Sequence, residues 1–258
     1  VSNELIINST PKGDRIALLQ DKRIVEYHLE ESEPHFSVGD IYLGTVKKMV
    51  TGLNAAFIDI GYEKDAFLHY HDLGPNVNSL NKFTKDVIAG RHNSGRLDNF
   101  KLEPEIDKHD KIDKVLGKNS PILVQVVKEP ISTKGPRLTA EISIAGRFLV
   151  LMPFADKVSV SQKIKTEEER VRLKQLIQSI KPKGFGVIVR TVAEEKKVAE
   201  LDNELKILVK RWEEAIAKVQ QSKGVSLILE ELGRTVGIIR DLFSPSFKHI
   251  HVNDAAVF

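Results

Sequence analysis

The chain has 258 residues, 41% of them hydrophobic and 29% charged, which is ordinary for a globular protein and enough for two or three small cores. The formal net charge of +3 is slight, so any nucleic-acid surface must be a local patch, and the absence of cysteine excludes disulfides and thiolate-type structural zinc. No apolar run approaches membrane-spanning length and no signal peptide opens the chain, so we expect a cytoplasmic protein.

Three short β-rich runs near the start of the chain predict a meander of strands. They are separated by segments of turn chemistry and comprise residues 4–9, 15–20 and 24–29. Three strands alone bury too little apolar surface to be stable, so they need a distant partner. The end of the chain supplies one, with a helix expected over residues 234–243 and a strand over 247–252. Asp14, Asp21 and Asp241 are most simply turn or surface residues.

Residues 44–73 contain two strands that place aromatic side chains opposite the core. Strand alternation predicts one continuous apolar face, made of Ala56, Ile58, Ile60, Ala66 and Leu68. The opposite face carries Phe57 beside Asp59 and Phe67 beside His69. One half-buried phenylalanine would be an ordinary packing residue. Two rings on the open face of a small barrel form a stacking platform for unpaired bases, so the pair favours RNA binding.

A long polar stretch, residues 74–120, follows without a sustained hydrophobic period, although residues 106–116 could form a short helix. Its basic and acidic residues are interleaved, so we expect a solvated excursion. The strand pattern returns at residues 121–127. Lys134 and Arg137 then lie in a turn close to where the barrel should finish, and a lysine in a turn is usually just solvated.

The region from residue 142 to about 231 combines strands with two helices. Residues 166–169 read as a capping box before the first helix, which ends before Pro182. A strand over 185–189 follows, and then a long amphipathic helix with one apolar stripe of Val198, Leu201, Leu205, Leu208, Trp212, Ile216 and Val219. Because Trp212 fits that stripe, we expect it in the core and not in base stacking.

Arg190 and Thr191 form the sharpest chemical feature of the sequence. They lie at the exit of a buried strand and just before a helix, where a guanidinium fork, a hydroxyl and free helix amides can converge on one phosphate. The pair by itself is weak evidence, since most arginines at strand ends are surface residues.

Four segments stand in the order of one protein family: residues 3–9 (NELIINS), 44–73, 148–153 (FLVLMP) and 186–191 (GVIVRT). Together they resemble the N-terminal half of the ribonuclease E/G endoribonucleases, over essentially the whole chain. Residues 44–73 by themselves are similar to the OB-type RNA-binding domain first described in ribosomal protein S-one.

The resemblance implies an α+β fold. A five-stranded OB-type β-barrel and a 5′-sensor α/β subdomain are inserted into a discontinuous ribonuclease-H-like domain that lacks catalytic carboxylates. The domains expected are residues 1–38 and 232–258 for the ribonuclease-H-like parts, 39–141 for the barrel with its insertion at 74–120, and 142–231 for the sensor.

The resemblance also assigns two groups of residues to RNA. The first group contacts single-stranded RNA: Phe57 and Phe67, which the strand pattern already indicates, are joined by Lys134, whose counterpart in the family helps to steer the strand. The second binds the 5′-monophosphate and comprises Arg190 and Thr191, with backbone help from Gly146 and Val150. A glycine at position 146 suits this role, because a missing side chain lets backbone amides approach an anion.

The implied function is a single-strand-specific endoribonuclease of RNA processing, rRNA maturation and mRNA decay. Cleavage in the family uses Mg²⁺ held by two aspartates of a later domain, followed by a cysteine-rich zinc link. We expect both after residue 258, so this chain should bind RNA without cutting it and should hold no catalytic or metal-binding residue. The parent enzyme is expected to be a homo-oligomer. The alternative is a non-catalytic OB-domain RNA-binding protein of translation or ribosome assembly.

Overall fold

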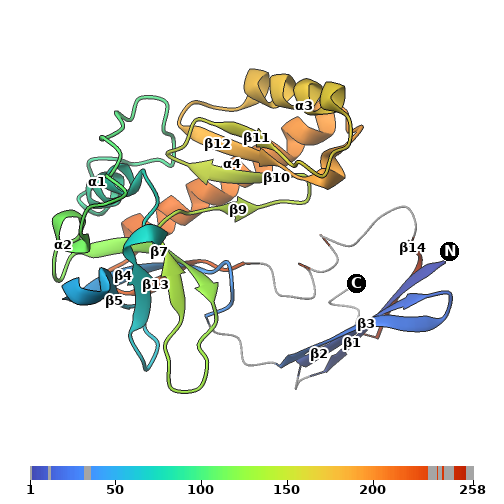
Figure 1. The fold of residues 1–258 in the computed structure, drawn as a ribbon, viewed down its shortest axis with the longest axis horizontal. Coiled ribbons are helices and arrows are strands. Elements are labelled where there is room, and N and C mark those ends of the chain that lie inside the picture. The colour runs from blue at the N-terminus through green and yellow to red at the C-terminus, as the bar shows by residue number, and fades with distance from the viewer. Residues whose placement is uncertain are drawn as a thin grey trace. The chain divides into compact units, whose positions relative to one another are not determined.

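The computed structural model describes residues 2–10, 13–31, 36–231, 237, 240 and 247–253 (Figure 1). The chain forms two compact units. The first unit combines Val1–His35 with Leu232–Phe258, and the second unit is Phe36–Glu231. The helix expected over 234–243, and Asp241 with it, lies essentially outside the described residues. Within the described parts of the chain, no helix combines the length and apolar character needed to cross a membrane.

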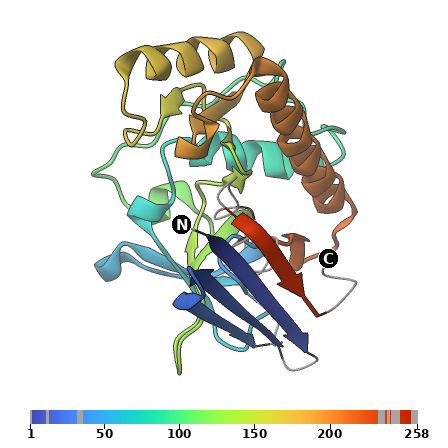
Figure 2. The ribbon, with the colours of Figure 1, turned by 90° about the vertical axis from the view of Figure 1, so that its right-hand side faces the viewer.

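The first unit contains a four-stranded sheet with the strand order β14-β1-β2-β3. Its strands are β1 (Asn3–Thr10), β2 (Gly13–Gln20), β3 (Arg23–Glu31) and β14 (Phe247–Val252). The meander is antiparallel, and β14 joins β1 in parallel, so the expected distant partner is present (Figure 2). A small core of Leu5, Ile7 and Ile16 is covered in part by β14. The ribonuclease-H-like character of this unit stays a prediction.

The second unit begins with a closed five-stranded barrel, which confirms the α+β fold with an OB-type barrel. The strands pair in the order β4-β5-β6-β8-β7, and β7 pairs back to β4. Their bounds are Ile41–Val50 (β4), Ala55–Asp59 (β5), Ala66–His69 (β6), Arg137–Thr139 (β8) and Pro121–Lys128 (β7). A further strand, β13 (Ser226–Leu229), pairs in antiparallel orientation with the first residues of β4.

Residues 74–120 are not the solvated excursion that the sequence suggested. They contain helix α1 (Val77–Ile88). The helix expected at 106–116 is reduced to the single turn α2 (Ile112–Val115). One face of α1 is buried, and Phe83 on it contacts Phe154 and Trp212 in an aromatic cluster. Asparagines and lysines between the buried positions of α1 hid the helical period. The insertion is therefore part of the core.

A second sheet, here called the β9–β12 sheet, has the strand order β11-β12-β10-β9 (Figure 1). Its strands are β9 (Ile144–Ala145), β10 (Leu149–Pro153), β11 (Val158–Val160) and β12 (Phe185–Val189). Helix α3 (Glu167–Ile180) packs along β11 and β12, and helix α4 (Val198–Gln221) along β9 and β10.

The long stripe of α4 is buried as expected, with two corrections in this region. Trp212 is fully buried and donates its indole N–H to the Gly95 carbonyl at 2.9 Å, but Val198 at the start of the stripe is 48% exposed. The capping box before α3 is wrong, because the Thr166 side chain makes no capping hydrogen bond. Glu169 instead accepts hydrogen bonds from the Arg172 guanidinium and from the Glu195 amide.

Candidate RNA interface and phosphate site

The outer face of the barrel carries a transverse row of side chains, one from each neighbouring strand. Phe57 of β5 is paired in register with Lys48 of β4 and with Phe67 of β6. Phe67 stands opposite Arg137 of β8, which is paired with Lys128 of β7. Both rings are half-exposed, whereas the residues beside them along each strand are buried. Two rings flanked by cations suit the bases and phosphates of a single strand.

Four aromatic side chains, here called the aromatic strip, lie in a chain of ring contacts on this face: Phe57, Phe67, His69 and His71. The Phe57 and Phe67 ring centroids are 5.8 Å apart in an edge-to-face arrangement. His69 lies 6.4 Å from Phe67, and His71 lies 5.1 Å from His69. The sequence placed His69 on this face but carries no signal for His71, because the chain leaves the strand between them.

Arg137 and Lys134 lie at one margin of the strip. The Arg137 guanidinium donates from Nε and Nη2 to one Asp72 carboxylate oxygen, at 3.0 and 2.8 Å. Lys134 is exposed in the turn that leads into β8. A Cβ at Gly135 would come within 2.3 Å of the Asp65 carbonyl oxygen, so this turn packs its backbone against the start of β6. The structure therefore brings Lys134 to the same region as Phe67.

Arg190 and Thr191 lie where β12 ends, beside the hairpin between β9 and β10. The Arg190 amide donates to the Phe148 carbonyl at 2.8 Å, and its Nη1 donates to the Gly146 carbonyl at 2.7 Å. The Thr191 and Ser161 hydroxyls are 2.9 Å apart. A hydroxyl offers one proton and two lone pairs, so Thr191 keeps hydrogen-bonding capacity for a ligand.

The helix expected directly after Arg190 is a single 3₁₀ turn, η3 (Thr191–Ala193), and α4 begins only at Val198. The dipole of a long helix is therefore not available at this position, because the dipole acts only within its own first turn. The positive charge here comes from side chains. Lys196 Nζ and Arg147 Cζ lie 5.2 and 5.4 Å from the centroid of the Phe148 ring, next to Arg190.

Gly146 makes two backbone hydrogen bonds within the protein and leaves room for a neighbouring carboxylate, while its help in phosphate binding stays a prediction. Its amide donates to the Leu149 carbonyl at 2.8 Å and closes the hairpin, while its carbonyl receives Arg190. A Cβ at this position would lie 2.8 Å from Cδ of Glu204, so the glycine makes room for a carboxylate of the protein itself. Val150 is half-exposed on β10, paired with Ile188 and Ala145 on the neighbouring strands. Its contact with phosphate stays a prediction.

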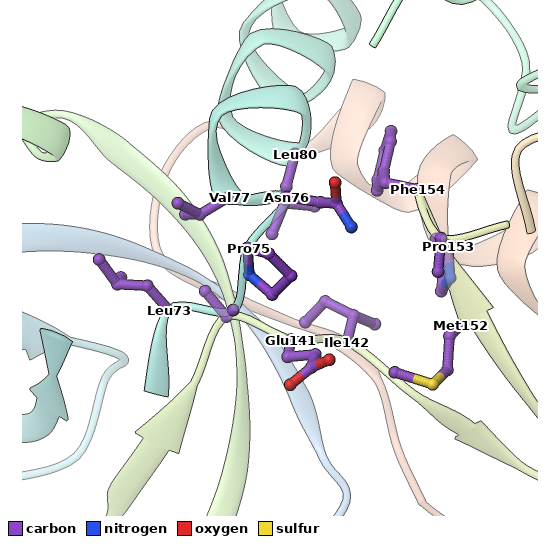
Figure 3. Close-up of a pocket in the computed structure, with 13 residues that line it drawn as sticks. Leu73, Pro75, Asn76, Val77, Leu80, Glu141, Ile142, Met152, Pro153 and Phe154 are labelled. Carbon is purple, nitrogen blue, oxygen red and sulfur yellow. The ribbon is translucent and has the colours of Figure 1, made fainter. Parts of the chain in front are cut away.

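Two hollows lie between the barrel and the β9–β12 sheet. The smaller encloses about 20 Å³ and is lined by Pro75, Leu80, Ile142 and Phe154, among others (Figure 3). Such a volume holds about one water molecule and no nucleotide.

The larger hollow is an open groove of about 520 Å³. Val127 and Thr139 of the barrel line one side of it, and Val150, Met152 and Ile188 of the β9–β12 sheet line the other. Thr139 follows Arg137 by two residues in β8, so side-chain alternation puts both on one face of that strand. Ile188 lies in β12 two residues before Arg190, which directly follows the strand. The groove is thus lined by Thr139 and Ile188, each two positions along the chain from a candidate RNA-binding arginine.

Among the described residues, no cluster of three or more His, Asp or Glu side chains is placed to hold a metal ion. The sequence alone carried no signal for Lys48, Lys128 or Glu204 as parts of these sites. Strand register identifies the first two, and the packing of α4 identifies the third.

Comparisons with known proteins show which family this chain resembles. A model of the ribonuclease E/G family matches residues 143–258. Over 255 residues, the chain is 33% identical to ribonuclease G of Haemophilus influenzae and 32% to ribonuclease G of Escherichia coli, covering 99% of this chain and 48% of each relative. It is 35% identical over 222 residues to ribonuclease E of Nostoc sp., covering 86% of this chain and 28% of that relative.

The closed five-stranded barrel defines the chain as an α+β protein with an OB-type fold, a class that often binds oligonucleotides. The chain belongs to the ribonuclease E/G family. It spans about half the length of the ribonuclease G relatives that it matches.

Proposed function

We propose that this chain forms the RNA-binding and 5′-end-recognising part of a single-strand-specific endoribonuclease of RNA processing and decay. The proposal is supported by three relatives, two of them named ribonuclease G and one named ribonuclease E. The whole protein would act on rRNA precursors and mRNA and would be a homo-oligomer.

The arrangement around Arg190 carries the proposal. Its guanidinium donates to the Gly146 carbonyl at 2.7 Å, and the following residue, Thr191, holds its hydroxyl 2.9 Å from that of Ser161. A fork of N–H donors and a hydroxyl suit the oxygens of one phosphate group. A terminal monophosphate carries more negative charge than an internal diester, so a compact site with nearby Lys196 and Arg147 can tell them apart.

The barrel strip supplies the sequence-tolerant part of binding. Phe57 and Phe67 would stack on bases, while Lys134 and the cations of the transverse row would attract the backbone. Duplex RNA should bind poorly because its bases are already stacked.

Mg²⁺-dependent cleavage is assigned to a part of the protein outside these residues. In the family that the chain resembles, two aspartates of a later domain hold the Mg²⁺ and a cysteine-rich zinc link follows; this chain has no cysteine.

The test compares one short single-stranded RNA with a 5′-monophosphate, a 5′-hydroxyl and a 5′-triphosphate end. We expect tighter binding of the monophosphate form and a loss of about 1.5–3 kcal/mol of its binding energy in Arg190→Ala, because a hydrogen-bonded charge pair is removed. Arg190→Lys should not restore it fully, since an ammonium lacks the guanidinium fork.

The matched control is the 5′-hydroxyl RNA, whose affinity should change little in both variants. Equal weakening for all three ends would make Arg190 a general backbone contact. That result would favour the alternative of an OB-domain binding module without end recognition.

A further inference from the structure

A single carboxylate of helix α4 holds the hairpin that carries Gly146. Oε1 of Glu204 accepts a hydrogen bond from the Arg147 amide at 2.7 Å. Oε2 accepts from the amides of Phe148 and Leu149, both at 2.8 Å. Three successive backbone N–H groups therefore converge on one anion, as in the amide concavities that bind phosphate in other proteins.

The position of this carboxylate is set by the protein core. Glu204 follows the buried Leu201 by three residues and precedes the buried Leu205, so the apolar stripe of α4 determines where it points. On the hairpin side, Gly146 leaves the space that Glu204 occupies, because a Cβ there would lie 2.8 Å from Cδ. Glu204 can therefore occupy this position only because residue 146 has no side chain.

The same hairpin orients Arg190. The carbonyl of Gly146, the residue directly before the three amides, accepts from Arg190 Nη1 at 2.7 Å. The line of contacts runs from the α4 core through Glu204 and the hairpin backbone to the guanidinium. If the hairpin turned, the Gly146 carbonyl would move and the guanidinium would lose its anchor.

We infer that Glu204 is a positioning residue for 5′-phosphate recognition: it locks the hairpin so that the Gly146 carbonyl holds Arg190 in the orientation that binds a terminal phosphate. This inference rests on the proposed function. The amides of Arg147, Phe148 and Leu149 already donate to Glu204, so they are not available to a ligand. A ligand phosphate must then be bound by Arg190, Thr191 and neighbouring cations instead of by the hairpin amides.

Glu204→Gln in the full chain is the direct test. The side chain keeps its size, but one oxygen becomes an NH₂ donor that faces amide donors, so the lock is broken without a cavity. We expect the preference for 5′-monophosphate over 5′-hydroxyl RNA to fall about tenfold, the size of one lost hydrogen bond to a charged group. The Kd for 5′-hydroxyl RNA should stay unchanged, which a generally unfolded variant would not show.

Asp202→Asn is the matched control. Asp202 lies on the same helix, two residues from Glu204, and pairs with Lys206 at 2.6 Å. It should leave the end preference unchanged. If Glu204→Gln fails to fold, Glu204→Asp keeps the charge but shortens its reach, and it should lower the preference to an intermediate value.

A double mutant separates positioning from an independent effect. Adding Glu204→Gln to Arg190→Ala should cost no further end preference, because the glutamate acts through the arginine. Additive losses would overturn the inference, as would tighter 5′-monophosphate binding by Glu204→Gln, which would make the glutamate a competitor of the phosphate. If Arg190→Ala keeps the end preference, the proposed function itself fails. If Arg190→Ala abolishes the preference and Glu204→Gln keeps it, only the role of Glu204 fails.

Discussion

At the scale of single residues, Phe57 and Phe67 owe their proposed role in base stacking to the side of the barrel on which they lie. The apolar residues beside them point inward and are fully buried, whereas the two rings remain half-exposed beside polar neighbours. Their removal should therefore affect ligand binding more than folding.

Alanine at position 57 or 67 should weaken single-stranded RNA binding by about 1–3 kcal/mol, because one base loses its stacking partner. Fluorescence anisotropy with a labelled single strand measures this loss, and thermal unfolding measures any change in stability. A variant that unfolds the barrel, with no separate effect on binding in the folded fraction, would show that the ring belongs to the core.

At the scale of elements, helix α1 turns the insertion at 74–120 into a structural part of the second unit. Phe83 is fully buried and contacts Phe100, Phe154 and Trp212 in the aromatic cluster. These rings come from the insertion, the end of β10 and helix α4. The cluster therefore joins the barrel insertion to the β9–β12 sheet and its helix.

Phe83→Ala should lower the free energy of unfolding by about 3–5 kcal/mol, since it leaves a large cavity in this cluster. Urea unfolding at neutral pH measures the change, and the exposed Lys85→Ala on the same helix is the control. A cost near zero for Phe83→Ala would mean that the insertion is not held to the rest of the unit by this ring.

A second element-scale contact holds the loop that carries Lys196. Glu169 of α3 accepts from the Glu195 amide at 2.8 Å, and Arg172 Nη2 donates to the Lys196 carbonyl at 3.1 Å. The hydrogen bond from Arg172 lowers the pKa of Glu169 below the ordinary range of a glutamate. A carboxylate with a lowered pKa stabilises the fold above its ordinary pKa, and this contribution is lost as the pH falls through the lowered value.

Glu169→Gln should therefore cost about 1–2 kcal/mol of stability at neutral pH, and the difference from wild type should shrink as the solution is acidified. Unfolding curves recorded across the acid range measure it, with the exposed neighbour Glu168→Gln as control. A difference that does not depend on pH would show that the charge of Glu169 contributes nothing.

At the scale of the whole molecule, the proposed function gives the chain recognition elements for both the end and the body of a single strand. The open groove of about 520 Å³ is lined by residues of both the barrel and the β9–β12 sheet, which carry these elements. The proposed function assigns RNA binding to these residues and cleavage to another part of the protein.

This separation predicts that residues 1–258 alone leave a labelled 5′-monophosphorylated strand intact in the presence of Mg²⁺. Denaturing gel electrophoresis of the RNA over time measures cleavage, and the same samples should still bind the strand. Specific cleavage that a point mutation within these residues abolishes would place the catalytic centre in this chain.

Local periodicity made much of the fold predictable from the sequence. Strand alternation correctly placed Phe57 and Phe67 opposite the buried face, and the stripe of α4 correctly placed Trp212 in the core. The helical period of α1 was missed because asparagines and lysines surround its few apolar residues. The helix N-terminus expected at Thr191 was wrong because a 3₁₀ turn and a loop precede α4.

The sequence by itself determined which side chains share a strand or helix face, because the covalent backbone sets these periods. It placed Arg190 and Thr191 at a strand exit by the same rule. Only the tertiary structure decided the neighbours of those side chains. Lys48 joins Phe57 through strand register, and Glu204 reaches amides that lie 55 to 57 residues earlier in the chain. Such contacts depend on the packing of distant segments, which no local period encodes.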